Sequence, residues 1–288
     1  MTSSGNPSLK PEESTAYTLG VVIEPTDGLA FTVDYFEIDV DNLVSGVDYS
    51  PVAALYYANN GVVNLPGITV KPGVPDPEHP TALPVLGFIE YSYRNADSQF
   101  VSGVDVTGDY RYDFDNGIRF NSHVDASYLI KSEKTIDGVV QRYDGTLSPC
   151  DVTSCSGSPD WRATWTNSAV WNKLTVALTA NYTAGLDNAS VDYGGVAGDC
   201  ASNIGASVVS FADGSPYNCS SESYLDFDMS ASYVVNDQFT VFANILNLTD
   251  KEAPLDPSAA YGLFNYNPAW TASGFRGRYF RIGVKADF

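Results

Sequence analysis

The dominant pattern in this chain is a strict alternation of apolar and polar residues, and it is clearest at the C-terminus. One side of that final segment is apolar and consists of Phe280, Ile282, Val284, Ala286 and Phe288. The opposite side consists of Tyr279, Arg281, Gly283, Lys285 and Asp287. A period of two predicts a β-strand with one apolar face and one hydrated face.

Eight earlier segments repeat this alternation. Their apolar rows span residues 17–23, 29–35, 100–112, 118–128, 161–171, 174–182, 225–233 and 239–245. With the final segment they make about nine strands, close to the ~9–11 residues that a tilted strand needs to cross a membrane. No stretch approaches the ~20 uninterrupted apolar residues of a membrane-spanning helix, so helical spans are excluded.

The connections between these strands alternate in length. Residues 24–28, 115–117, 172–173 and 236–238 hold turn-forming residues in hairpin context, whereas residues 41–89, 131–159, 184–223 and 250–277 form long connections. All long connections therefore emerge on one side, which a soluble β-sandwich has no reason to arrange. We predict an all-β, antiparallel, up-and-down transmembrane barrel with short periplasmic turns and long extracellular loops.

Charge and aromatic content narrow the function classes. The chain carries 35 acidic and 15 basic residues, a net charge of -20, which argues against nucleic-acid binding. An acidic lumen with acidic outer loops and a merely solvated acidic surface both remain open. Aromatic residues make up 13% of the chain, as expected where girdles meet the two membrane interfaces.

Four cysteines lie in two of the long connections. They are Cys150, Cys155, Cys200 and Cys219. Three connectivities are possible, but pairing within each loop costs the least closure entropy. We therefore predict the disulfides Cys150–Cys155 and Cys200–Cys219, which imply an oxidising compartment. A zinc site would favour tighter spacing and nearby histidines, which are absent from the neighbouring sequence.

The final strand resembles the closing signal of outer-membrane barrels. The residues that carry this resemblance are Phe280, Arg281, Gly283, Ala286 and Phe288. In such barrels the terminal aromatic residue is presented to the insertion machinery, the role the resemblance implies for Phe288. Ala286 departs from the pattern, because a larger residue is usual there.

Four stretches together resemble the C-terminal part of the barrel of a TonB-dependent outer-membrane receptor. Residues 5–20, with Pro7-Ser-Leu-Lys-Pro-Glu12, are similar to a late loop-to-strand signature, and residues 31–38 to the strand that follows it. Residues 244–251, ending in Asn247-Leu-Thr-Asp-Lys251, are similar to the penultimate strand. Residues 265–270, followed by Gly277-Arg278 and the closing strand, complete the order.

This resemblance implies a transport protein of the Gram-negative outer membrane, not an enzyme, with no cofactor. Family members couple the proton-motive force, through TonB, to uptake of scarce solutes such as ferric siderophores, vitamin B12 or oligosaccharides. The expected partners are outer-membrane lipid, the barrel-insertion machinery, the TonB complex, the remainder of the receptor and an unidentified small molecule. We expect residues 1–288 to be the C-terminal portion of the barrel, without the plug domain, the N-terminal strands or a signal peptide.

Some candidate residues keep two interpretations. His123 and Asp125 are i and i+2 neighbours on the inferred lumenal face, where a hydrogen-bond network is favoured over a catalytic dyad. Asp226 and Asp228 follow from strand alternation and need no calcium. The loop aromatics Tyr261, Phe264, Tyr266 and Trp270 either stack on a substrate or pack against one another.

Low loop basicity argues mildly against strongly anionic siderophores and leaves neutral glycans open. Two other functions remain as alternatives: a passive porin-like barrel and a secreted β-sandwich binding module.

Overall fold

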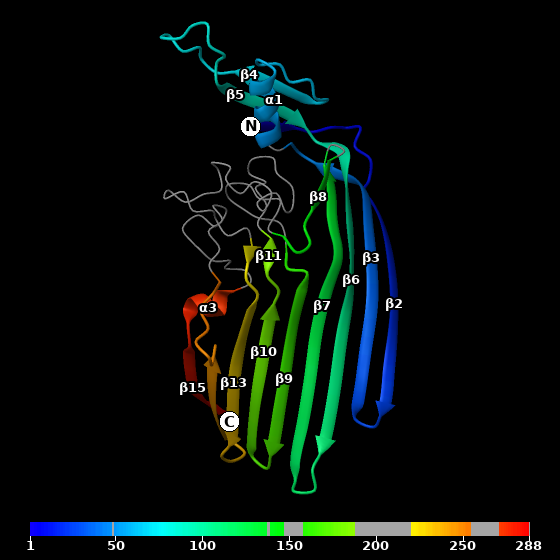
Figure 1. Ribbon diagram of the computed structural model, residues 1–288, viewed down its shortest axis with the longest axis vertical. Helices are drawn as coiled ribbons and strands as arrows, with labels where there is room; N and C mark the ends of the chain where they lie inside the picture. The colour runs from blue at the N-terminus through cyan, green and yellow to red at the C-terminus, as the bar shows by residue number, and fades with distance from the viewer. Residues whose placement is uncertain (48, 137–138, 147–157, 188–219, 255–270, 288) are drawn as a thin grey trace. The chain divides into compact units, whose positions relative to one another are not determined.

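The computed structural model describes residues 1–288 except 48, 137–138, 147–157, 188–219, 255–270 and 288 (Figure 1). The described chain divides into two compact units. Unit 1 comprises Met1–Thr15, Asp39–Gln99 and Lys134–Val140, and unit 2 comprises Ala16–Ile38, Phe100–Glu133 and Gln141–Phe288.

The main sheet is an antiparallel meander in which each strand pairs with the next long strand of the chain. Its order is β15-β14-β13-β10-β9-β7-β6-β3-β2, with β8 pairing β7 off this path. The strands are β2 (Glu13–Thr26), β3 (Leu29–Ser45), β6 (Arg94–Asp113), β7 (Ile118–Ile136), β8 (Val139–Arg142), β9 (Trp161–Trp171), β10 (Leu174–Thr183), β13 (Tyr224–Val234), β14 (Phe239–Leu246) and β15 (Tyr279–Ala286). The nine segments with alternating residues each fall on one strand of this path, so the predicted antiparallel architecture is confirmed.

Four short turns join these strands at one end, seen at the bottom of Figure 1. They connect β2 to β3, β6 to β7, β9 to β10 and β13 to β14. Gly28, Gly117 and Asn172 take positive φ angles of 78°, 80° and 51° in three of them, the conformation that tight hairpins require. The connections at the other ends of these strands are longer, as the sequence predicted, and the one between β10 and β13 contains β11 (Leu186–Asp187) and β12 (Ser220–Ser221).

Unit 1 adds regular structure that was not predicted from the sequence. Residues 41–89 were predicted only as a long connection, and they contain the end of β3, helix α1 (Tyr49–Ala58), β4 (Ile68–Pro72) and part of β5 (Leu86–Ser92). Strand β1 (Thr2–Ser4) joins β5 and β4 in a three-stranded sheet. Buried Val52, Ile68 and Ile89 form its core. Segments too short to show periodicity become regular because they bury apolar surface together.

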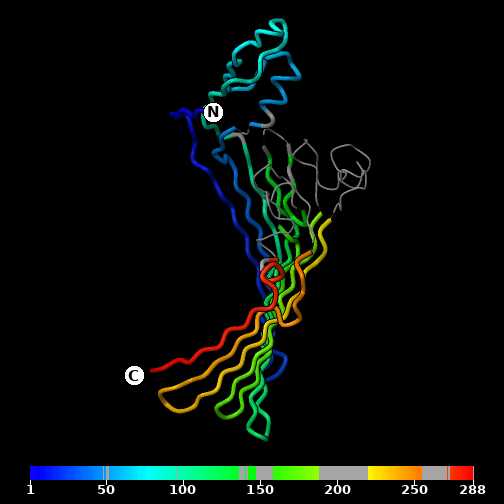
Figure 2. The backbone as a smooth tube through the Cα atoms, turned by 90° about the vertical axis from the view of Figure 1, so that its left-hand side faces the viewer, coloured from blue at the N-terminus to red at the C-terminus, as the bar shows by residue number. Residues whose placement is uncertain are grey.

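Unit 2 contains a further short helix, α3 (Ala272–Arg276), just before β15. In the described parts of the chain, no helix has the length and apolar character needed to cross a membrane. Figure 2 shows the strands at the C-terminal end of the sheet curving away from β6 and β7 at the end that carries the short turns. Strands β14 and β15 therefore lie in a curved part of the sheet.

Candidate functional site

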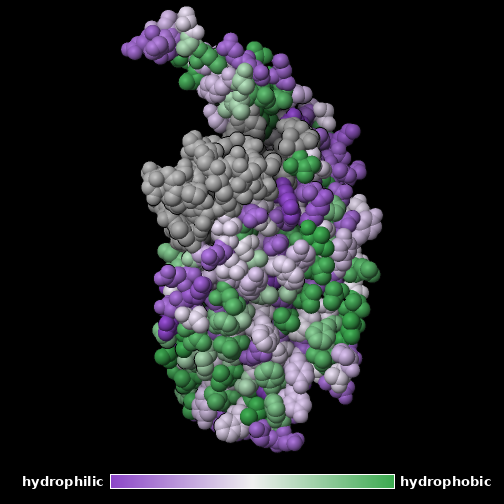
Figure 3. All heavy atoms as spheres, in the orientation of Figure 1, coloured by the Kyte–Doolittle hydropathy of each residue, from purple (hydrophilic) through white to green (hydrophobic). Residues whose placement is uncertain are grey.

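One face of the sheet in unit 2 exposes the apolar rows that the sequence predicted. The large exposed side chains on these rows include Leu19, Val21, Phe31, Trp161, Trp165, Trp171, Leu178, Val241, Phe280, Ile282 and Val284. In Figure 3 hydrophobic side chains, in green, gather over the strands. An apolar surface of this extent is stable only against another apolar phase, and its alternation with polar residues is typical of lipid-facing barrel strands.

Trp165 shows how this apolar face satisfies its few polar atoms. Its indole Nε1 donates a hydrogen bond of 2.9 Å to the hydroxyl of Ser122 on the neighbouring strand. An indole N–H without a partner is costly where no water is available. Ser122 therefore belongs on the apolar row even though its side chain is polar.

The opposite face carries a row of charged and hydrogen-bonded side chains along β6 and β7. His123 lies between two carboxylates, with Nδ1 2.7 Å from Asp109 Oδ1 and Nε2 2.7 Å from Asp125 Oδ2. Nearer the short turn, Arg119 donates to Asp113 at 2.7 Å. Farther from the short turn, the hydroxyl of Ser127 donates a hydrogen bond to Asp105.

This arrangement decides between the two interpretations of His123. A general base needs a free ring nitrogen to accept a proton from a nucleophile. Both nitrogens of His123 face carboxylates, so the residue belongs to a hydrogen-bond network on the polar face rather than to a catalytic dyad.

The polar face continues across β9, β10 and β13. Thr166 and Thr179 share a hydrogen bond of 3.0 Å, and Asn181 donates to Asp228 Oδ2 at 3.2 Å. The other oxygen of Asp228 accepts the backbone N–H of Asn247 at 2.8 Å. Both oxygens of Asp228 are thus used by protein donors, which explains the carboxylate without a calcium ion.

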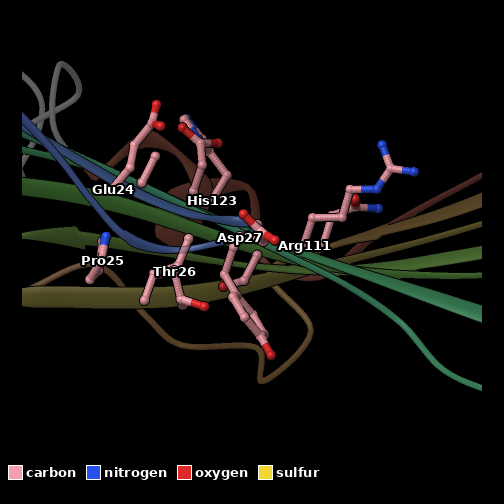
Figure 4. Close-up of a pocket in the computed structure, with 13 residues that line it drawn as sticks. Glu24, Pro25, Thr26, Asp27, Arg111 and His123 are labelled. Carbon is pink, nitrogen blue, oxygen red and sulfur yellow. The ribbon is translucent and has the colours of Figure 1, made fainter.

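A pocket of about 750 Å³ lies on this polar face, next to the β2–β3 turn (Figure 4). It is lined by the turn residues Glu24 to Ala30 together with residues of β6 and β7, among them Arg111 and His123. The turn is seated on β6 by a hydrogen bond of 2.7 Å from the Arg111 backbone N–H to the Gly28 carbonyl. The pocket is therefore part of the same charged surface and not a separate apolar cavity.

The closing strand has the geometry that the alternation predicted. In its register with β14, Phe280, Ile282, Val284 and Ala286 pair with Ile245, Ala243, Val241 and Phe239 on the apolar side. Arg281 lies on the other side, with its guanidinium carbon 5.6 Å from the centre of the Phe242 ring. Gly283 is the Cα partner of Phe242.

The signature near the N-terminus is held by side chains of unit 1 that the sequence did not single out. The Asn95 side chain accepts from the backbone N–H of Lys10 at 2.8 Å and donates to its carbonyl at 2.9 Å. Glu12 accepts the backbone N–H of Val44 at 2.8 Å. The proline-containing run thus acts as a fixed entry into β2, and Asn95 is the residue that anchors it.

The motif after β14 forms a hydrogen-bonded corner in unit 2. Asn247 is fully buried with a positive φ of 50°, and its side chain bonds the backbone N–H of Lys251 at 2.8 Å and its carbonyl at 2.9 Å. Asp250 accepts the backbone N–H of Arg278 at 2.7 Å. Tyr224 of β13 reaches the same corner, donating to the Lys251 carbonyl at 3.3 Å.

Several predicted residues lie outside the described part of the chain. They are Cys150, Cys155, Cys200, Cys219, Tyr261, Phe264, Tyr266, Trp270 and Phe288. The two disulfides, the substrate-contacting aromatics and the terminal aromatic remain predictions from the sequence.

Comparisons with known proteins identify a β-barrel family, in agreement with a sheet that has one apolar and one polar face. The family model described as "TonB dependent receptor-like, beta-barrel" matches residues 1–248. No curated protein sequence gives a significant match.

Solved structures show where the fold recurs. The siderophore receptor PirA from Acinetobacter baumannii matches with a TM-score of 0.57 at 16% identity, over 99% of this chain and 33% of PirA. A mutant of the ferric enterobactin receptor PfeA from Pseudomonas aeruginosa gives 0.55 at 15% identity, over 98% and 32%. The FrpB iron transporter from Neisseria meningitidis gives 0.51 at 13% identity, over 100% and 32%. Identities this low show the fold alone, and the chain spans only about a third of each receptor's length.

Proposed function

Because the chain belongs to the TonB-dependent receptor-like β-barrel family, we propose that it forms the C-terminal part of the barrel of an outer-membrane receptor that takes up a scarce solute. The observation that carries this proposal is the meander with an exposed apolar face on one side and a hydrogen-bonded polar face on the other. The apolar face would contact outer-membrane lipid, and the polar face would line the lumen. Homologues in this family are outer-membrane proteins of Gram-negative bacteria.

The proposed orientation puts the short turns in the periplasm and the long connections outside the cell. An epitope inserted at Asp76 or Glu252 is then expected to bind antibody on intact cells. The same epitope inserted at Asn116 or Asp237, in short turns, is expected to bind only after the outer membrane is permeabilised. Antibody binding to the latter two positions on intact cells contradicts the orientation.

Coupling to TonB is the second part of the proposal. Energy coupling would act through the plug domain, which we place in the part of the receptor that this chain does not include. Uptake by the complete receptor is expected to stop when TonB is deleted or the proton-motive force is dissipated. Uptake that continues under both conditions identifies a passive porin-like barrel instead.

For the substrate we propose either a ferric siderophore or a neutral oligosaccharide. The siderophore receptor PirA and the ferric enterobactin receptor PfeA share the fold and favour the first class. The net charge of -20 favours the second, because it repels strongly anionic iron chelates. Growth of a deletion strain on iron-limited medium with added siderophores, and separately on glycans as the carbon source, distinguishes the two.

A further inference from the structure

Gly283 of the closing strand leaves a gap that an aromatic ring occupies. A Cβ atom added at Gly283 would lie 2.5 Å from Cζ of Phe242, 2.9 Å from Cε1 and 3.1 Å from Cε2. All three nearest atoms belong to that one ring. A glycine inside a strand usually weakens it, and it persists where another group approaches the backbone closely.

Arg281 adds a second contact to the same ring. Its guanidinium carbon lies 5.6 Å from the ring centre, within the range of a cation–π interaction. Arg281 and Gly283 are two residues apart and therefore share one face of β15. Phe242 on the neighbouring strand thus contacts both Arg281 and Gly283 of the closing signal. Neither contact was predicted from the sequence.

A second glycine–phenylalanine pair in unit 2 differs from this one in what closes the space beside the glycine. A Cβ atom at Gly103 of β6 would lie 2.6 Å from Cζ of Phe36 and also 2.7 Å from the backbone oxygen of Tyr128. Backbone as well as ring therefore closes the space at Gly103. At Gly283 the three nearest atoms all belong to the Phe242 side chain.

We propose that Phe242 is a positioning residue of the barrel-closing strand, whose ring fits the space over Gly283, is held there by Arg281, and sets β15 on β14 during insertion. The ring covers backbone that glycine leaves open and restricts the residue that has the most conformational freedom to lose. The pair of strands that it fixes, β14 and β15, lies in the curved part of the sheet of unit 2 (Figure 2). The proposal rests on the proposed outer-membrane function but not on the substrate.

The test is the rate at which the complete receptor becomes a folded barrel in the outer membrane of a Gram-negative host. Folded barrels are followed after pulse labelling by their faster migration in unheated detergent gels. Gly283→Ala is expected to slow assembly about tenfold, which corresponds to about 1.4 kcal/mol in the barrier to assembly. Phe242→Ala alone is expected to assemble more slowly than the wild type, but faster than Gly283→Ala. Adding Phe242→Ala to Gly283→Ala is expected to bring the rate up to that of Phe242→Ala alone, because the smaller side chain makes room.

Two controls belong to this experiment. The double variant Gly103→Ala with Phe36→Ala is expected to remain as slow as Gly103→Ala, because the Tyr128 backbone oxygen still blocks the space. Thr240→Ala, on the same face of β14 and paired with Lys285, is expected to assemble at the wild-type rate. A role confined to the finished barrel would lower its resistance to denaturation without changing the assembly rate.

The proposal is overturned if Gly283→Ala assembles normally, if the Phe242→Ala double variant is no faster than Gly283→Ala, or if only final stability changes. Arrival of the wild-type protein in the outer membrane tests the proposed function separately. Should it fail to arrive, the same variants unfolded in urea and refolded into phospholipid vesicles still give the order of rates that decides the role of Phe242.

Discussion

Two isoleucines in the two units show opposite solutions to the same problem. Ile89 in unit 1 is 1% exposed and packs with Val52 and Ile68, whereas Ile282 in unit 2 is 79% exposed on the apolar face of β15. The hydrophobic effect drives apolar side chains out of water, so both positions are stable only if their surroundings differ. The core of unit 1 is shielded from water by its own segments, whereas the proposed function places the exposed apolar face of unit 2 in lipid.

The difference also separates two kinds of sequence information. Where lipid is the surrounding phase, every second residue must be apolar along the whole strand, and the pattern is local and repeated. Where water surrounds the unit, a few apolar residues from separate segments are enough to form a core, and no local sequence pattern marks those residues. The alternation along a strand can be recognised in the sequence. The contacts that form a core between separate segments can be recognised only in the folded structure.

The largest expected effect is Ile89→Ala in unit 1. Removing a fully buried side chain is expected to destabilise this unit by about 2–5 kcal/mol, because a cavity remains. Limited proteolysis within residues 46–93 is expected to become much faster, while the sheet of unit 2 keeps its resistance to unheated detergent. Val74→Ala, at an 87% exposed position of the same unit, is the matched control and is expected to change nothing.

A charge placed on each face of the sheet is expected to give the next largest effect. Ile282→Lys on the apolar face should cost about 2–4 kcal/mol if the position lies near the membrane midplane, and less toward the interface. Thr107→Lys, on the polar face between Asp105 and Asp109, should be tolerated. The measurement is denaturant unfolding of the receptor refolded in lipid vesicles. Greater sensitivity at Thr107 means that the two faces are assigned the wrong way round.

The strands and short turns could be predicted because their determinants are local. Rows such as residues 225–233 alternate without interruption, and turn residues such as Gly117 fall between rows. The roles of Asn95 and Phe242 could not be predicted, because each depends on a partner across the sheet or in another strand. Asn95 meets Lys10, 85 residues away, and Phe242 meets Gly283 only through the β14–β15 register.

The smallest of the three expected effects belongs to the corner at Asn247. Asn247→Ala removes the two hydrogen bonds that its side chain makes to the backbone of Lys251, at a cost of about 1–3 kcal/mol. The same unfolding assay in vesicles measures it, and Asn244→Ala, on the strand before the corner, is expected to have little effect. Equal loss at both positions indicates that the motif acts through the strand and not through the corner.

The number of strands along the path of the main sheet is odd, and this restricts how the sheet can close. Its strands alternate in direction along a path of nine, so β2 and β15 at the two edges run the same way. Antiparallel pairing requires opposite directions, and these two edges cannot satisfy one another by it. Any all-antiparallel barrel that contains this sheet must insert an odd number of further strands between them, which makes its total even, as in bacterial outer-membrane barrels.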